Sequence, residues 1–269
     1  MKTCVIYAAS ITVPEKLFVV HDFFKVFKEH FSDADFYVGL NYGSLPEQED
    51  IIRSYVPNCE FIRMDDEDLY TYMDTSASQR ALRLIQAALK AGKHYDVYWS
   101  AHTKGGKAQR DEVRQLYFDN FFSKRKEIEE MFEKYPWLGS WGLRGNARNS
   151  CGVWWKDYNV DTTVPICSNV KFTPFNYTHV NWSYIETMFA LKGEPFEAFV
   201  NILDERFFTT KMDRWYWETV PAWIPSRCGF FPYIKIRKCF WDVVPDLNII
   251  TKQWIEENNL MHLLPYLSL

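Results

Sequence analysis

The regular alternation of short apolar segments with amphipathic ones constrains the fold of this chain most. Lys2–Ala9 (KTCVIYAA) is apolar without a polar alternation, which is typical of a strand buried on both faces of a sheet. Glu15–His30 carries apolar residues at helical spacing. A strand at 36–40, a helix at 47–55 and a strand at 59–64 follow in the same manner. This β-α-β-α-β order predicts a parallel sheet whose ligands bind beyond the carboxyl ends of its strands.

The same two periodicities predict the later elements. They are a helix at 76–91, a strand ending near residue 102, a long helix at 111–135, strands at 137–143 and 171–181, and helices at 183–191 and 194–208. The polar stretch 144–170 reads as a loop over the site, and the tail from Lys211 reads as short aromatic helices with Pro-interrupted connections. The sequence therefore predicts the α/β class: a mostly parallel, Rossmann-like sheet flanked by helices, with a C-terminal aromatic helical region.

The length of 269 residues fits one large domain or a domain with a small appendage. We expect an α/β domain over 1–192 that binds the ligand and a C-terminal helical region over 193–269. One continuous domain is the alternative.

Composition excludes several classes of protein. A formal net charge of −4 and a pI near 5.9 argue against nucleic acid as the main partner, because such proteins present basic surfaces. We see no signal peptide and no apolar stretch long enough to span a membrane, so a cytoplasmic protein is expected. Six cysteines without a CxxC motif indicate reduced thiols rather than a zinc site or a disulfide framework.

The strand that ends near residue 102 is followed by His102, Thr103, Lys104 and two glycines. A lysine ammonium neutralises phosphate directly and a histidine can donate to it, so this turn is a candidate phosphate site. It matches neither the P-loop nor the dinucleotide fingerprint. The alternative is that Lys104 and Lys107 only solvate a turn.

Two other groups of charged residues precede this strand. The acidic loop after the third predicted strand could bind a divalent cation such as Mn or Mg through Asp65, Asp66 or Asp68, or it could be a solvated surface loop. Asp74 and Arg80 could bind a donor's sugar or ribose hydroxyls, or they could serve the cap and the solvated face of a helix.

Arg214 and Glu218 are spaced i, i+4 and are flanked by Trp215 and Trp217, so guanidinium and carboxylate share one helix face among groups that stack on rings. Glu218 is the candidate general base for an attacking hydroxyl. A surface ion pair is the alternative reading. The second carboxylate cluster, Asp204-Glu205-Arg206, reads as the polar face of a helix.

Four stretches resemble one family. Tyr95–Gly105 (YDVYWSAHTKG) resembles the apolar strand and His-Thr-Lys-Gly signature of glycosyltransferases related to the rhamnan-synthesis F-like proteins. Asp74, ahead of the helix predicted at 76–91, is similar to the Asp of the family's Asn-x-Gly-x-Asp element before the same helix. Phe172–Ile185 is similar to a strand and helix start through Asn176, Tyr184 and Ile185, and Arg214–Glu218 resembles an Arg-Tyr-x-x-Glu element.

The resemblance implies a type-A glycosyltransferase fold and inverting transfer of a sugar from a nucleotide-diphosphate donor to a glycan hydroxyl. Together with the chemistry of the residues, it leads us to expect donor contacts from His102, Thr103, Lys104, Asp74 and Arg80. Asn176, His179 and Trp215 are expected to contact the acceptor or the sugar, and for His179 a place in the core is the alternative. In type-A enzymes an Asp-x-Asp at the 102–104 turn binds a metal, so we expect weak or no metal dependence here and no strictly required cofactor. The alternative is a carbohydrate- or nucleotide-sugar-binding protein without catalysis.

Overall fold

The computed structural model describes residues 1–64, 73–103, 111–136, 138–148, 181–184, 188–205, 208 and 231–237. In 73–76, 144–148, 181–184 and 231–237 only the backbone is described. The strands are β1 (Thr3–Ala9), β2 (Asp35–Leu40), β3 (Glu60–Arg63), β4 (Val97–His102), β5 (Leu138–Arg148), β6 (Asn181–Tyr184), β7 (Phe189–Lys192) and β8 (Phe231–Arg237). The helices are η1 (Pro14–Lys16), α1 (Phe18–His30), α2 (Glu47–Tyr55), α3 (Met73–Lys90), α4 (Asp111–Asn120), η3 (Phe122–Lys124), α5 (Arg125–Lys134) and α7 (Gly193–Asn201).

The described strands form one sheet in the order β3-β2-β1-β4-β7-β5-β6, with β8 on β5. β3, β2, β1 and β4 are parallel, whereas β7 is antiparallel to both β4 and β5. β6 is also antiparallel to β5, and β8 is parallel to it. Six of the eight strands therefore run in one direction, and the predicted α/β class with a mostly parallel sheet is confirmed.

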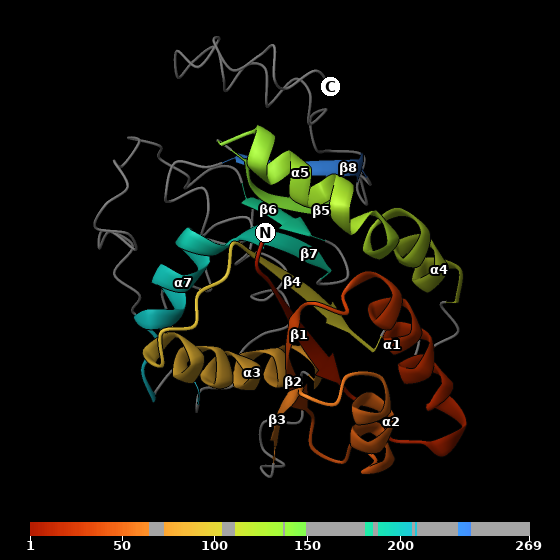
Figure 1. The fold of residues 1–269 in the computed structure, drawn as a ribbon. Helices are drawn as coiled ribbons and strands as arrows, with labels where there is room; N and C mark the ends of the chain where they lie inside the picture. The colour runs from red at the N-terminus through yellow and green to blue at the C-terminus, as the bar shows by residue number, and fades with distance from the viewer. Residues whose placement is uncertain are drawn as a thin grey trace.

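Helices cover both faces of this sheet, as Figure 1 shows for α3 and α7 on one side and α1 and α4 on the other. The alternation of side chains along β1 explains the two layers. Cys4 and Ile6 pack with α3 and α7, whereas Val5 and Tyr7 pack with α1, α2 and α4. β1 therefore requires helices on both of its faces.

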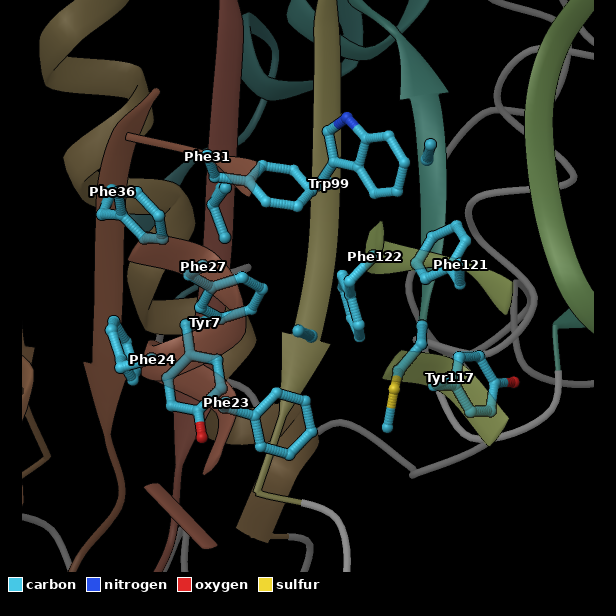
Figure 2. Packing of buried hydrophobic residues seen from close by; sticks show 14 of the residues in the cluster. Tyr7, Phe23, Phe24, Phe27, Phe31, Phe36, Trp99, Tyr117, Phe121 and Phe122 are labelled. Atoms are coloured by element: carbon cyan, nitrogen blue, oxygen red, sulfur yellow. The ribbon is translucent and has the colours of Figure 1, made fainter. Parts of the chain in front are cut away.

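The aromatic residues fill the layer between the sheet and α1, α4 and η3. Figure 2 shows Tyr7, Phe27, Phe31, Trp99 and Phe122 gathered there. Ring centroids lie 5.1 Å apart for Phe31 and Trp99 and 5.2 Å apart for Phe27 and Phe122, in edge-on geometry. Among these residues the aromatic surplus of the sequence serves core packing.

The single long helix predicted over 111–135 is wrong. The chain turns at Phe121, whose φ of −129° and ψ of −69° are not helical, and η3 separates α4 from α5. The turn lets the adjacent residues Phe121 and Phe122 both pack near Trp99, with centroid distances of 4.6 and 6.4 Å. A continuous helix would point two adjacent side chains about 100° apart, so the core packing overrides the helical periodicity.

The helix predicted over 183–191 is also wrong, because β6 and β7 occupy this part of the chain. Phe189 and Leu191 face α3 and α7, whereas Met188 and Ala190 face the opposite layer. Both faces of β7 are apolar, which hides the two-residue period of a strand buried between β4 and β5.

Two further boundaries differ from the prediction. β5 continues to Arg148, five residues beyond the predicted strand, because β6 pairs with 145–148 and β8 pairs along β5 as far as Gly145. Residues 149–170 lie outside the described residues. β8 is a strand where short helices were predicted, and its sequence FPYIKIR contains the alternation of Ile234 and Ile236 with polar residues that signals a strand. The rest of the predicted C-terminal helical region, 209–230 and 238–269, lies outside the described residues.

The composition predicts reduced thiols and no membrane-spanning segment. Cys4 and Cys59 are free and buried, and burial raises the pKa of the Cys59 thiol to about 11. Among the helices described, none combines the length and the apolar character needed to cross a bilayer.

A buried charge network fastens α5 to the rest of the molecule. Arg125 donates to Glu129 over 2.7 Å, to Asp33 and to the carbonyl of His30, and Glu129 accepts a 2.7 Å bond from Thr3 of β1. The Arg125 hydrogen bond lowers the pKa of the Asp33 carboxyl. The side chain of Arg125 is only 6% exposed, so its removal would leave Glu129 buried without its cation.

We predict that Arg125→Ala lowers the free energy of unfolding by about 3 kcal/mol or more, because breaking a buried pair leaves an uncompensated charge. Lys124→Ala, which removes a neighbouring exposed pair with Glu127, should cost less than about 1 kcal/mol. Urea denaturation of both variants measures the difference. An equal loss of unfolding free energy in both variants would show that the buried Arg125 network stabilises the fold no more than an exposed ion pair does.

Candidate functional site

The sheet contains a switch point at β1. β1 lies between β2 and β4, and it is parallel to both. The chain therefore proceeds from β1 to one side through β2 and β3 and later returns to the other side as β4. In open α/β sheets, ligands bind beyond the carboxyl ends of the strands at such a point. The residues that follow the three strands are Ser10, Asn41 and Thr103.

The ends of β1 and β4 are joined by side-chain hydrogen bonds. Thr103 Oγ1 accepts a 3.0 Å bond from the backbone N–H of Ser10 and lies 3.0 Å from Ser10 Oγ. The backbone N–H of Thr103 donates to the carbonyl of Ala8 over 3.1 Å. Both residues are buried, with exposed fractions of 5% for Thr103 and 7% for Ser10.

The residue after Ser10 is fixed by α2. The N–H of Ile11 donates to Gln48 Oε1 over 3.0 Å, and Gln48 Nε2 donates back to the carbonyl of Ile11 over 2.9 Å. Ser44 Oγ also donates to the carbonyl of Ala9. Gln48 is fully buried, so its carboxamide serves as an internal partner for the backbone that leaves β1.

His102 lies at the end of β4 on the face that α3 covers. In register it stands beside Ala8 of β1, which stands beside Gly39 of β2. α3 comes very close at this row, since a Cβ on Gly39 would lie 1.9 Å from the carbonyl oxygen of Ala77. Because Gly39 and Ala8 have small side chains, the first turns of α3 pack closely on the carboxyl half of the sheet, next to the strand that carries His102.

Asn41 is a buried polar residue without a hydrogen-bond partner for its side chain among the residues that the structure describes. It is 0% exposed, and both its Oδ1 and its Nδ2 are unpaired. Its backbone N–H continues the sheet by donating to the carbonyl of Ala9 over 2.9 Å. The alternation that places Tyr37 and Gly39 on the α3 face places Asn41 there as well.

Such a group is costly to retain, because an unpaired buried amide loses its bonds to water and gains none. A group of this kind in a native protein needs an explanation, and a ligand that reaches the carboxyl edge would supply one.

The predicted site residues fall into two groups. His102, Thr103 and Arg80 are described: His102 ends β4, Thr103 follows it, and Arg80 is half-buried on α3. For Asp74 the backbone alone is described, in the first turn of α3, which begins at Met73. The others lie outside the described residues, namely Asp65, Asp66, Glu67, Asp68, Lys104, Asn176, His179, Arg214, Trp215 and Glu218. Their place in the site stays a prediction.

Sequence reasoning missed Ser10, Asn41, Ser44 and Gln48. The signal for two of them was present, because Ser10 and Asn41 are the first polar residues after apolar strands, as His102 is near the end of β4. Gln48 gave no signal, since a glutamine in the first turn of an amphipathic helix is ordinarily solvated.

The strongest pKa shifts lie at the opposite, amino edge of the sheet. Tyr98 donates to Glu197 over 2.9 Å, and Tyr95 donates to Asp35 over 2.6 Å. Burial, reinforced by these carboxylates, raises the pKa of both tyrosines above their usual range, and it raises that of Tyr37 to about 12. Glu197 also accepts from the N–H of Tyr95, so this network anchors α7 to β4 and serves the fold.

Among the described residues, no group of three or more His, Cys, Asp or Glu side chains could hold a metal ion. The acidic loop 65–68 lies outside these residues.

Comparison with known proteins assigns no family. No family model matches the chain, and no curated protein matches it in sequence. The resemblance carried by His102-Thr-Lys-Gly therefore stays a prediction.

Three solved structures are similar to this chain at low identity. CMP:2-keto-3-deoxy-manno-octonic acid synthetase complexed with CTP is 11% identical, with 97% of this chain and 99% of that chain covered and a TM-score of 0.38. 4-Diphosphocytidyl-2C-methyl-D-erythritol synthase from Anaerococcus prevotii is 8% identical, with 95% and 98% covered and a TM-score of 0.39. Core-mannan synthase A from Aspergillus fumigatus, in a Mn/GDP form, is 11% identical, with 87% and 72% covered and a TM-score of 0.38. At these scores the likeness assigns no activity to this chain.

We predict that Asn41→Leu raises the free energy of unfolding by about 1 kcal/mol, because it replaces an unpaired buried amide with an apolar group of similar size. Gln48→Leu is the matched control: it removes an equally buried but fully paired amide, and it should lower stability by about 1–3 kcal/mol. Thermal and urea denaturation give both values. A loss of stability in Asn41→Leu would mean that Asn41 has a structural partner.

Proposed function

We propose that this protein is a glycosyltransferase that binds a nucleotide-diphosphate-sugar at the carboxyl edge of β1, β2 and β4. The observation that carries the proposal is the set of buried polar residues at the switch point, with His102 and Thr103 on one side of β1 and Asn41 on the other. A pocket between strand ends with a few converging polar groups is the usual setting for a nucleotide in an α/β protein.

The donor's diphosphate would lie over the end of β4. Lys104 directly follows Thr103 in the sequence, and we propose that its ammonium neutralises phosphate charge while His102 donates a hydrogen bond. The unpaired side-chain amide of Asn41 would form hydrogen bonds with a polar edge of the nucleoside. Asp74 and Arg80 of α3, which approaches the sheet at Gly39, would bind ribose or sugar hydroxyls.

Transfer would proceed by direct displacement. The acceptor hydroxyl attacks the anomeric carbon, the bond from this carbon to the phosphate oxygen breaks, and the nucleoside diphosphate leaves. Glu218 takes the proton of the attacking hydroxyl as general base, and Arg214 holds its carboxylate in place. Asn176, His179 and Trp215 would contact the sugar or the glycan acceptor. This mechanism inverts the anomeric configuration.

Lys104 supplies positive charge where type-A glycosyltransferases use a metal bound to Asp-x-Asp, so we propose that a divalent metal contributes little to donor binding. The contrary case is a Mn or Mg ion held by Asp65, Asp66 or Asp68. Donor binding that disappears in excess EDTA and returns with Mn would establish that case.

The second candidate function is binding of a carbohydrate or nucleotide sugar without catalysis. The turn at 102–104, which has no carboxylate, favours this candidate. The two functions differ in slow donor hydrolysis, because a transferase with bound donor releases some nucleoside diphosphate to water and a lectin releases none.

We predict that Lys104→Ala weakens binding of the preferred nucleotide sugar by roughly 10- to 100-fold, the worth of one hydrogen bond to a charged group. Lys126→Ala, which removes an exposed lysine on α5, should leave the dissociation constant unchanged. Isothermal calorimetry over a panel of nucleotide sugars measures both. Unchanged binding in Lys104→Ala would place the phosphates elsewhere.

We predict that Glu218→Gln reduces sugar transfer about 100-fold or more while donor affinity stays within twofold, because a general base contributes to the transition state and not to donor binding. Release of nucleoside diphosphate with and without acceptor measures the rate. Asp204→Asn, in the second carboxylate cluster, is the matched control and should transfer at the normal rate. Full activity in Glu218→Gln would assign the base to another residue.

A further inference from the structure

The side chain of Thr103, in the His102-Thr103-Lys104 turn, makes its hydrogen bonds to Ser10 at the end of β1. Its Oγ1 accepts the N–H of Ser10 and shares a second 3.0 Å hydrogen bond with Ser10 Oγ. A threonine hydroxyl has one donor and two acceptor positions, so these two contacts use most of its capacity. The side chain is directed across to β1 and not out of the sheet edge.

Ser10 is itself held between two fixed neighbours. On one side Ala8 accepts the N–H of Thr103 over 3.1 Å, and on the other Ile11 is paired with the buried carboxamide of Gln48. The end of β1 is therefore a rigid support, and the bonds from Thr103 attach the end of β4 to it. The chain leaves β4 directly after this attachment, with His102 before it and Lys104 after it.

We propose that Ser10 and Thr103 form a clamp that fixes the end of β4 against β1, and that Thr103 is a positioning residue for His102 and not itself a phosphate ligand. The inference rests on the proposed function. It differs from the role that the sequence predicted for Thr103, which was direct contact with the donor. It also assigns a role to Ser10, which the sequence did not single out.

Two substitutions separate positioning from direct contact. Thr103→Val keeps the shape of the side chain but removes the Oγ1 that accepts the Ser10 N–H, whereas Thr103→Ser keeps the hydroxyl. Thr3→Val is the matched control, because Thr3 is an equally buried threonine whose hydroxyl bonds Glu129 at the opposite end of β1. Hydrogen exchange of the Ser10 amide and calorimetry with nucleotide sugars are measured on all three variants and the wild type.

We expect Thr103→Val to exchange the Ser10 amide at least about tenfold faster and to bind donor about tenfold more weakly, a change that corresponds to about 1.4 kcal/mol. Thr103→Ser should restore both values to within about twofold of the wild type. Thr3→Val should leave donor binding unchanged, and through its lower overall stability it should speed exchange of the Ser10 amide no more than that of the other amides of β1. This pattern would establish that the hydroxyl acts through the bond to Ser10.

Three results would overturn the inference. Slow Ser10 exchange in Thr103→Val would show that no clamp depends on the hydroxyl. Weak donor binding with unchanged exchange would make Thr103 a direct ligand. Equal loss of affinity in Thr3→Val would reduce the effect to general stability. If the wild type binds no nucleotide sugar at all, the proposed function fails, and with it the role of Thr103 in positioning, whereas the exchange data still decide whether the clamp exists.

Discussion

The structure depends on the burial of β1 on both faces. None of its seven residues is more than 2% exposed, so each face needs a helical layer, and the alternation of side chains along the strand assigns those layers. Parallel neighbours on both edges complete its backbone hydrogen bonds. Because β1 is parallel to both β2 and β4, the carboxyl ends of all three strands lie next to one another at the same edge of the sheet.

The buried polar side chains at the two edges of the sheet have different hydrogen-bond partners. At the amino edge, Glu197 and Asp35 accept bonds from buried tyrosines, and the network joins α7 to β4. At the carboxyl edge, Gln48 and Thr103 bond backbone groups, while the Asn41 side chain is unpaired among the described residues. Shifted pKa values alone would therefore direct attention to the amino edge, where the groups hold the fold together. The proposed site rests instead on the buried polar residues at the switch point, among them the Asn41 side chain.

The sequence predicts the first half of the fold well because its local and tertiary signals agree. β1, β2 and β4 are short, mostly apolar runs, β3 has an apolar centre at Phe61 and Ile62, and each of α1 to α3 has an amphipathic period, so propensity and packing select the same element. The predictions failed where packing decided. Phe121 and Phe122 both enter the core only if the helix breaks, and β7 is apolar on both faces because it lies between two strands. Of the candidate site, the sequence predicted the residues at the end of β4 but not Asn41 or Gln48. Whether an amide side chain is buried depends on neighbours that are distant in the chain, so the local sequence does not indicate it.

We propose that a nucleoside diphosphate binds at the carboxyl edge where β1, β2 and β4 end. Hydrogen-exchange footprinting with each common nucleoside diphosphate at saturating concentration tests it most directly. Binding at this edge predicts slower exchange in 8–13, 41–45 and 100–104, with no change in 93–97 or 193–198 at the amino edge. Protection confined to the amino edge, or the absence of protection with every nucleotide, would contradict it.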